Sequence, residues 1–382
     1  MKNFSNLSRL CKVLALTALF CTVSCAQNSD DSSSSGIIPK SKAGVLAVFY
    51  QPGSRGDLSY TDMLSAGVNK AALKHNLLLA QYEPKDLDSI SPLFNQSLLL
   101  CDRMIKDKKK ALIIFASPDF KSFISANSSK ISEYAEKGVI FLSDESKENA
   151  ASYIHTFYMP FYGVNYEAGI AASSLLSADQ KALLLLEDAE NASLKEYSKA
   201  FLSGFCASKT HGKESDALWG TLLKDILEDN QSKDKIKNVL IVPVQERRNE
   251  ENLTDILYMF AKLEEDKELD VHLILPYCGK AVHGLLLYNR ENPDSYYTIG
   301  TDVDMQFYSD RVPFSIVKHI DKVIEKCVDQ ALEGTLPKHQ NFGLKDGYTE
   351  LVLSSRYEPG LAEIVEKAHQ TAIEKEEAYE NN

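Results

Sequence analysis

The stretch ALIIFAS at residues 111–117 is apolar over its first six positions, without the alternation of a half-buried strand. Three runs of the same kind surround it: GVLAVFY (44–50), LLLAQYE (77–83) and VIFLSD (139–144). Patterns with helical spacing separate them, at Thr61–His75, Ser91–Lys106 and Phe120–Lys137. Unbroken apolar strands that alternate with helices predict a parallel sheet with helices on both faces.

A second series of the same kind follows. Its expected strands are 181–188, 238–244, 271–277 and 296–302, and its expected helices are Glu167–Ser177, Ser193–Lys209, Glu251–Lys267 and Ala281–Arg290. A chain of 382 residues exceeds the ~250–300 residues at which one core stops growing. Two successive α/β units therefore predict a two-lobed, doubly wound α/β protein.

The remaining segments complete this plan. The aromatic stretch YIHTFYMPFYG (153–163) is expected to be an extended crossover between the lobes, because Pro160 disfavours a helix. Later elements are a strand at 313–319, a helix to Leu332, a strand at 350–355 and a helix from Pro359. Residues 210–237 fit no clean element and are interpreted as an insertion.

The N-terminus has the features of an export signal. Residues 1–25 place three basic residues before an apolar run at Val13–Val23, which is too short for a membrane span of ~20 residues. Ser24 before Cys25 resembles a bacterial lipobox, so Cys25 is the expected lipidation site. The alternative is a plain secretory signal with an incidental cysteine. Residues 26–43 are polar and serine-rich, which predicts a disordered tether.

These features predict a protein bound to the cell membrane by a lipid and facing the periplasm or the cell exterior. The charge argues against one class of partner. Lysine and arginine number 42 against 54 acidic residues, a formal net charge of −12. Binding to nucleic acid requires a basic surface, so we expect no nucleic-acid partner.

Sequence motifs of common enzymes are missing from the chain. There is no G-x-G-x-x-G, no P-loop and no G-x-S-x-G, and the eight histidines show no metal-ligand spacing. His283 lies near Cys278, but it falls in an expected helix without a third orienting group. We therefore expect no catalytic residues, no metal and no cofactor.

The pattern indicates instead where a ligand would bind. In open α/β sheets ligands bind beyond the carboxyl ends of the strands. The candidates follow each expected strand: Gln51–Tyr60, Ser117–Phe120 with Asp119, Asp144, Glu187–Asp188, Tyr277–Lys280 and Asp302–Gln306.

Several of these segments together resemble one protein family. They are GSRGDLSYTDMLSAGV (53–68), YGVNYEAGIAASSLL (162–176), YYTIGTDVDMQFY (296–308), PFSIVKHIDKVI (313–324) and GLKDGYTEL (343–351). In this order and spacing they resemble the basic membrane protein family of bacterial substrate-binding lipoproteins, whose best-understood members bind purine nucleosides for import.

The resemblance implies a type I periplasmic binding protein fold, in which two lobes joined by three crossovers hold the ligand between them. The lobes would comprise 44–150 plus 313–340 and 151–312 plus 341–382. The implied partners are a nucleoside or a similar ring-plus-polyol compound and the permease of an ABC-type importer.

Residue roles implied by the resemblance begin in the first lobe. Tyr60 matches an aromatic residue that stacks on the base, and Asp57 caps the same turn. Asp144 matches an aspartate that hydrogen-bonds the edge of a purine. Each has a structural alternative, namely a helix N-cap for Asp57, a core residue for Tyr60 and a turn residue for Asp144.

In the second lobe, Asp302 or Asp304 matches the acid that holds the ribose hydroxyls, and the other would cap a helix or pair with Arg311. Lys318 matches the lysine that reaches the same sugar. A lysine on an apolar strand is costly unless it is paired, which favours a place in the cleft.

The sequence also departs from the family. The second stacking aromatic is absent after 238–244, where residues 245–248 read QERR, and Tyr277 or Trp219 would have to replace it. These departures leave two alternatives open. One is a changed ligand, such as riboflavin or a sugar, and the other is a surface interaction lipoprotein that retains only the scaffold.

Overall fold

The computed structural model describes residues 42–144, 151–177, 180–186, 192–207, 239–243, 271–279, 282–292 and 296–381. The expected signal with Cys25, nearly all of the tether, residues 210–237 and the helix at 251–267 lie outside these ranges.

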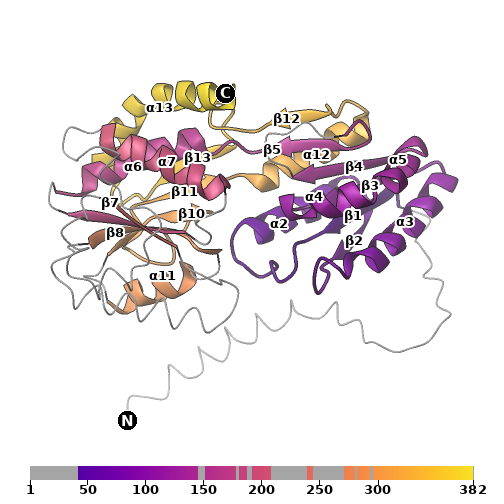
Figure 1. Cartoon of the computed structure of the whole chain (residues 1–382), viewed down its shortest axis with the longest axis horizontal. Coiled ribbons are helices and arrows are strands. Elements are labelled where there is room, and N and C mark those ends of the chain that lie inside the picture. The colour runs from indigo at the N-terminus through magenta and orange to yellow at the C-terminus, as the bar shows by residue number, and fades with distance from the viewer. Residues whose placement is uncertain are drawn as a thin grey trace, which may run out of the picture. The chain divides into compact units, whose positions relative to one another are not determined.

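The first sheet holds six strands that are all parallel, in the order β12-β5-β4-β3-β1-β2 (Figure 1). Its strands are β1 (Gly44–Phe49), β2 (Leu77–Tyr82), β3 (Lys110–Phe115), β4 (Val139–Asp144), β5 (His155–Tyr158) and β12 (His339–Asn341). The four runs expected from the sequence are confirmed, whereas β12 was not expected. Its residues His-Gln-Asn carry no apolar pattern.

Helices cover both faces of this sheet. On one face, Leu46 and Val48 of β1 pack against α2 (Tyr60–Lys74) and α12 (Ile320–Glu333). The cluster of buried apolar residues on this face is called the first core. On the other face, Phe49 packs against Phe94 of α3 (Ile90–Lys106). The expected helix over 120–137 is interrupted, because η1 (Pro118–Phe120) and α4 (Lys121–Ala126) precede α5 (Ser128–Glu136). Both faces of β1 are therefore buried, as its apolar sequence predicted.

The remaining described strands form two separate hydrogen-bonded sheets, β7-β6-β8-β9 and β10-β11-β13. Because β8 contacts β10, the two are together called the second sheet below. Its strands are β6 (Lys181–Leu186), β7 (Val239–Pro243), β8 (Val271–Tyr277), β9 (Tyr297–Thr298), β10 (Gly300–Asp302), β11 (Phe314–Lys318) and β13 (Thr349–Leu353). The single strand expected at 296–302 is split at Ile299, and each half joins one of these two sheets. Among the strands that the structure describes, only β13 runs antiparallel to its neighbour.

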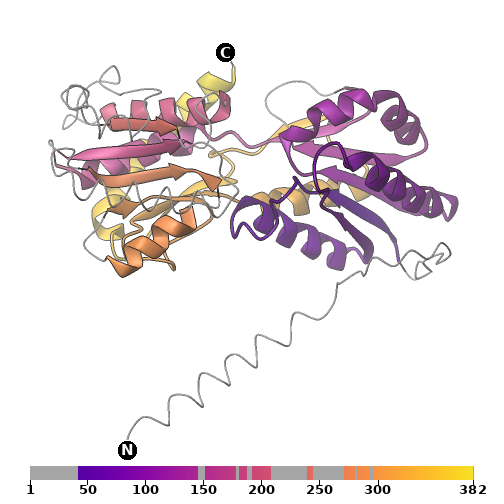
Figure 2. The ribbon, with the colours of Figure 1, turned by 60° about the horizontal axis from the view of Figure 1, so that its bottom comes forward.

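Four described helices accompany the second sheet. Their bounds are α6 (Tyr162–Leu175), α7 (Ala192–Ala207), α11 (Val282–Glu291) and α13 (Glu358–Glu380). Figures 1 and 2 show α6 and α7 together on one face and α11 on the other. Side chains of α6 and α7 form the second core with β8 and β11. Among the helices that the structure describes, none has the length and apolar character needed to cross a membrane.

The chain passes between the two sheets three times, as the predicted fold requires. The first crossing is at Pro160, since Met159 belongs to the first core and Phe161 to the second. The second is at His319, between β11 and α12. The third is at Gly343, between Phe342 in the first core and Leu344 in the second.

Two of the expected lobe boundaries differ from the observed strand pairing. A boundary after residue 150 would separate β5 from β4, with which it pairs. A boundary after residue 312 would place β11 in the first lobe, yet β11 pairs with β10 and β13 of the second sheet. The reason is that Phe314 and Ile316 of β11 are buried in the second core.

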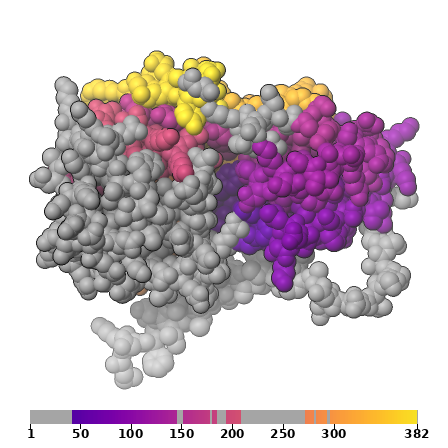
Figure 3. Space-filling model, in the orientation of Figure 1, coloured from indigo at the N-terminus to yellow at the C-terminus, as the bar shows by residue number. Residues whose placement is uncertain are grey.

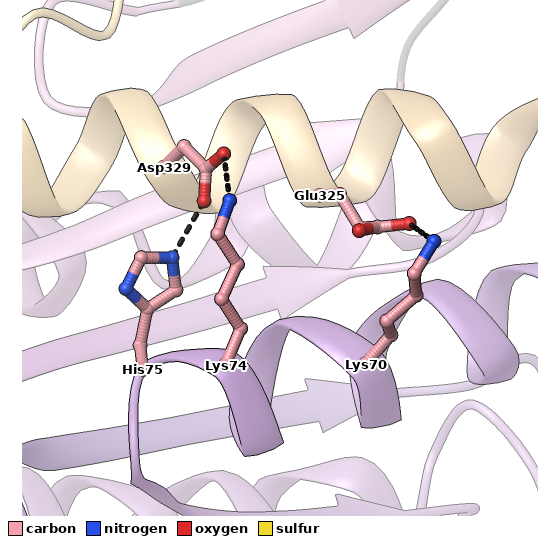
Figure 4. A network of polar contacts seen from close by, with 5 residues as sticks. All are labelled: Lys70, Lys74, His75, Glu325 and Asp329. Atoms are coloured by element: carbon pink, nitrogen blue, oxygen red, sulfur yellow. Dashed lines mark hydrogen bonds and ion pairs between the residues drawn. The ribbon is translucent and has the colours of Figure 1, made fainter.

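The packing of α2 against α12 depends on a glycine. A Cβ atom at Gly67 would lie 2.6 Å from the Cα and carbonyl oxygen of Asp321, so only glycine permits this approach. Figure 4 shows ion pairs beside the contact, where Lys70 reaches Glu325 at 2.7 Å and Lys74 reaches Asp329 at 2.6 Å. Such exposed pairs contribute little to stability because water and salt screen them, so we attribute the stability of this contact mainly to its close packing.

The C-terminal helix α13 packs on α6, and part of it is visible at the surface in Figure 3 (yellow). Beneath it, Glu167 of α6 is 1% exposed and contacts Nδ1 of His369 at 2.6 Å. Burial raises the pKa of Glu167 to about 7, although His369 opposes the shift and Glu376 and Glu350 add to it.

We expect Gly67→Ala to lower the free energy of unfolding by about 1–3 kcal/mol, because the added methyl group overpacks the α2–α12 contact. Gly360→Ala is the matched control, since a Cβ there meets no atom within 4 Å. Urea unfolding of both variants measures the difference. Equal stabilities of the two variants would contradict this account.

Glu167 should make the stability of the fold depend on pH. Its carboxyl group binds a proton more tightly in the folded protein than in the unfolded chain, where its pKa has the ordinary value of 4.5. Its stabilising contribution is therefore complete below pH 4.5 and lost as the pH rises to about 7. The difference in free energy of unfolding between Glu167→Gln and the wild type should therefore shift in favour of Glu167→Gln by up to about 3 kcal/mol as the pH rises from 4.5 to about 7.

Urea unfolding from pH 4.5 to pH 8 measures this relative gain, with Glu363→Gln on the exposed face of α13 as the control. A difference between Glu167→Gln and the wild type that stays constant with pH would contradict the assignment.

Candidate functional site

The ammonium group of Lys318 lies at the centre of the candidate site. Lys318 ends β11, directly before the second crossing, and its side chain is only 14% exposed. Its Nζ lies 4.1, 5.2 and 5.6 Å from the ring centroids of Phe161, Tyr197 and Tyr60. These distances are within cation–π range. A buried cation is thus surrounded by aromatic rings from three separate parts of the chain.

Lys318 also faces acidic partners, of which the nearest is Asp302, with Nζ 3.5 Å from Oδ1. Burial alone would lower the pKa of Lys318, but Tyr197, Asp302 and Asp144 outweigh it and raise the pKa above its ordinary value. Lys318 is therefore protonated at neutral pH and is a permanent hydrogen-bond donor in the site.

Tyr60 and Asp144 form a second polar contact beside Lys318. Tyr60 is the first residue of α2, Asp144 is the last residue of β4, and the Tyr60 hydroxyl donates to Oδ2 of Asp144 at 2.6 Å. Burial and the neighbouring Asp144 raise the pKa of Tyr60 well above its ordinary value. Tyr60 therefore stays neutral and fixes the orientation of a carboxylate that is itself 9% exposed.

Asp302 ends β10 in an unusual backbone conformation. Its φ is +64°, and the N–H of Val303 donates to the carbonyl of Thr301 at 2.8 Å, the pattern of a γ-turn centred on Asp302. A non-glycine residue in this region costs of order 1–3 kcal/mol. The turn presents the carboxylate to two partners, Lys318 and the hydroxyl of Ser59, which donates to Oδ2 at 3.4 Å.

Asp57 has the geometry of its structural alternative. Its carboxylate accepts backbone N–H groups of Ser59, Thr61 and Asp62 at 2.9–3.1 Å, so it caps the first turn of α2. Its carbonyl oxygen lies 2.9 Å from Nε2 of His283, so the loop before α2 contacts helix α11, which accompanies the second sheet.

Asp304 is likewise held locally. It accepts the backbone N–H of Gln306 at 3.1 Å, and the hydroxyl of Ser315 lies 3.5 Å from Oδ1. The described contacts of Asp304 fix the loop after β10. Of the two acids left open by the sequence, Asp302 is the one next to Lys318.

Tyr277 and Asp119 lie at the carboxyl ends of their strands, but in different surroundings. Tyr277 is buried, and its hydroxyl donates to Oδ1 of Asn165. The side-chain amide of Asn165 in turn donates to the carbonyl of Phe161 at 2.7 Å, so Tyr277 supports the position of that residue. Asp119 is exposed and accepts from Gln51.

Three residues that surround Lys318 or support its neighbours were not identified from the sequence, namely Phe161, Tyr197 and Asn165. Phe161 lies in the aromatic stretch 153–163, which was expected only as a crossover, and its place directly after Pro160 was the available signal. Tyr197 lies inside α7 and Asn165 inside α6, and neither position carries a pattern that distinguishes it from an ordinary helical residue.

The cluster combines chemistry that suits a neutral ring bearing hydroxyl groups. Tyr60, Phe161 and Tyr197 supply aromatic surface, while Lys318 supplies a donor and Asp144 and Asp302 supply acceptors. Within the described ranges, no group of three or more His, Cys, Asp or Glu side chains could hold a metal ion.

Solved structures resemble this chain in fold. One is a transcriptional activator of the comK gene from Bacillus halodurans, with a TM-score of 0.62, 14% identity and coverage of 86% of this chain and 98% of that one. Another is an ABC transporter solute-binding protein from Aeropyrum pernix K1, with a TM-score of 0.59, 15% identity and coverage of 88% and 86%.

A third structure is an ABC transporter solute-binding protein from Burkholderia graminis in complex with D-arabinose, with a TM-score of 0.52, 8% identity and coverage of 84% and 98%. At these identities the similarity shows the fold, which is the predicted type I periplasmic binding protein fold.

No curated protein matches the chain. Residues 263–382 match the family described as ABC transporter substrate-binding protein, PnrA-like (Bmp). This match confirms, over that part of the chain, the predicted resemblance to the PnrA-like substrate-binding proteins of ABC transporters.

Proposed function

We propose that this protein is the substrate-binding component of an ABC-type importer and that it binds a nucleoside, with a purine base preferred. The observation that carries the proposal is the convergence of three aromatic rings and two carboxylates on Lys318. These groups come from strands of both sheets and from the helices beside them, so a ligand held by them would keep the two lobes together. Closure of this kind is a hinge motion.

Each group has a role in the proposal. The base stacks on aromatic surface from Tyr60, Phe161 or Tyr197, because a flat apolar ring gains most from such contacts. Asp144 accepts hydrogen bonds from the edge of the base. The carboxylate of Asp302 accepts from two adjacent ribose hydroxyls, and Lys318 donates to a ribose oxygen. The protein catalyses no reaction in this proposal.

The proposal extends to the location and partner of the protein. Cys25 would carry the lipid that anchors the protein at the cell membrane, and the closed form would deliver its ligand to a membrane permease. Export is supported by the basic and apolar segments before Cys25, and the permease by the family match.

The rings of Phe161 and Tyr197 bear on the alternative of a scaffold that has lost its ligand. That alternative was favoured by the missing second aromatic after the strand at 238–244. Residues 245–248 lie outside the described ranges, but Phe161 and Tyr197 supply aromatic surface from other elements. A nucleoside site therefore does not depend on that position.

We expect adenosine, guanosine or inosine to raise the melting temperature of the protein, with binding measurable by isothermal titration calorimetry. Asp302→Asn should weaken binding at least tenfold, because it removes the charge that ribose hydroxyls and Lys318 both contact. Asp304→Asn is the matched control and should bind like the wild type, because Asp304 contacts Gln306 and Ser315.

The same titration should include uridine, riboflavin and D-ribose. Tighter binding of one of these compounds would change the proposed ligand but leave the proposed site unchanged. If no compound binds, and mass spectrometry finds no small molecule released from the denatured protein, the nucleoside proposal is wrong and the interaction protein remains.

A further inference from the structure

A buried carboxylate beneath the C-terminal helix contacts two of the three crossings. Glu376 of α13 is 5% exposed. Its Oε2 accepts the backbone N–H of Gly163 and its Oε1 accepts that of Leu344, both at 2.9 Å. Burial raises the pKa of Glu376, and these two backbone donors oppose the shift.

The two donors belong to segments that are far apart in the sequence. Gly163 lies in the first turn of α6, three residues after the crossing at Pro160. Leu344 directly follows the crossing at Gly343. The segments run side by side, since β12 pairs with β5 and the N–H of Phe342 donates to Tyr158 at 2.9 Å. One carboxylate thus bridges both crossings at the point where they enter the second core.

Glycines make room for this carboxylate. A Cβ atom at Gly343 would lie 2.4 Å from Oε1 of Glu376, and one at Gly163 would lie 3.0 Å from Oε2 and 2.9 Å from the carbonyl oxygen of Ala372. Neither glycine has a positive φ, so close approach rather than backbone conformation explains why these positions are glycine. A glycine in each crossing segment, Gly163 in the first and Gly343 in the third, thus leaves space for one oxygen of Glu376.

The bridge leads directly to the candidate site. Gly163 is two residues after Phe161, whose ring lies 4.1 Å from Nζ of Lys318. The N–H groups in the first turn of a helix have no partner within the helix, and a negative charge there is stabilising. The carboxylate of Glu376 supplies a hydrogen-bond acceptor and a negative charge at this end of α6. Its hydrogen bond to Gly163 thus lies in the turn that directly follows Phe161.

The end of α13 carries further contacts with the same turn. The rings of Tyr162 and Tyr379 stack at 4.7 Å, and Nζ of Lys375 lies 4.9 Å from the ring centroid of Tyr166. The second crossing is tied to the third at a different point, where the N–H of His319 donates to Tyr348 at 2.8 Å. The third crossing is thus bonded to both of the others.

We propose that Glu376 is a positioning residue that joins the first and third crossings into one rigid hinge element and thereby sets Phe161 in the candidate site. The two crossings then bend together when the lobes open. Without the carboxylate, the N–H groups of Gly163 and Leu344 lose their shared acceptor, and the two segments move independently.

The test compares Glu376→Gln with Glu377→Gln in the full chain. The amide keeps the size of the side chain but turns an NH2 group toward one of the two donors. Glu377 is the adjacent control, because it is exposed and pairs with Lys345 at 2.7 Å. Spin labels at Leu99→Cys on α3 and Leu287→Cys on α11, both exposed positions, report the distance between the lobes by double electron–electron resonance. Cys206 and the N-terminal cysteines Cys11, Cys21 and Cys25 are replaced by serine to prevent labelling there.

We expect a broader distance distribution in Glu376→Gln and an unchanged one in Glu377→Gln. Hydrogen exchange at Gly163 and Leu344 should be at least tenfold faster in Glu376→Gln only. A folded Glu376→Gln protein with the distribution and exchange of the wild type would overturn the proposal.

If Glu376→Gln does not fold, Gly343→Ala with the same labels decides, since its methyl group would lie 2.4 Å from Oε1 of Glu376 and displaces the carboxylate. Broadening supports the proposal and an unchanged distribution refutes it. No ligand is needed for these measurements, so their outcome is independent of the nucleoside proposal.

Discussion

The requirement to pair a buried ammonium group determines much of this structure. Lys318 is enclosed at the point where β11 leaves the second sheet, and an isolated charge there would be strongly unfavourable. Asp302 and Asp144 compensate the charge, and the rings of Phe161, Tyr197 and Tyr60 surround it. Because these residues belong to strands of both sheets and to helices that pack on them, the same interactions that satisfy the lysine also connect the two halves of the protein. The polar groups best suited to hold a ligand are thus the ones that stabilise the crossing.

The sequence predicted the repeating architecture because that depends on local patterns. Fully apolar strands such as β3 and β4 specify a sheet that is buried on both faces, and the structure confirms the alternation of strands and helices. The expected boundaries placed β11 with the first lobe, whereas it pairs with β10 and β13, and Phe314 and Ile316 are buried in the second core. The short strand β12 was missed because its residues His-Gln-Asn carry no apolar pattern, and only its pairing with β5 identifies it as a strand.

The candidate site divides in the same way. Tyr60, Asp144, Asp302 and Lys318 follow or end strands, where a general rule places ligand-binding groups, and the structure brings them together. Asp57 and Asp304 satisfy the same rule but serve backbone N–H groups and a loop. Tyr197, Asn165 and Glu376 lie within helices, and only the tertiary packing brings them to the site or to the crossings. Position in the sequence therefore indicated which residues lie near the strand ends, but not which of their side chains come together around Lys318.

A crystal structure of the protein grown with guanosine tests the central claim most directly. The account predicts a base in contact with the ring of Tyr60, Phe161 or Tyr197, ribose hydroxyls within hydrogen-bond distance of Asp302, and Lys318 beside the same ribose. A nucleoside bound elsewhere, or a site in which Lys318 and Asp302 are separated from Tyr60 and Asp144 while the ligand is bound, would contradict it.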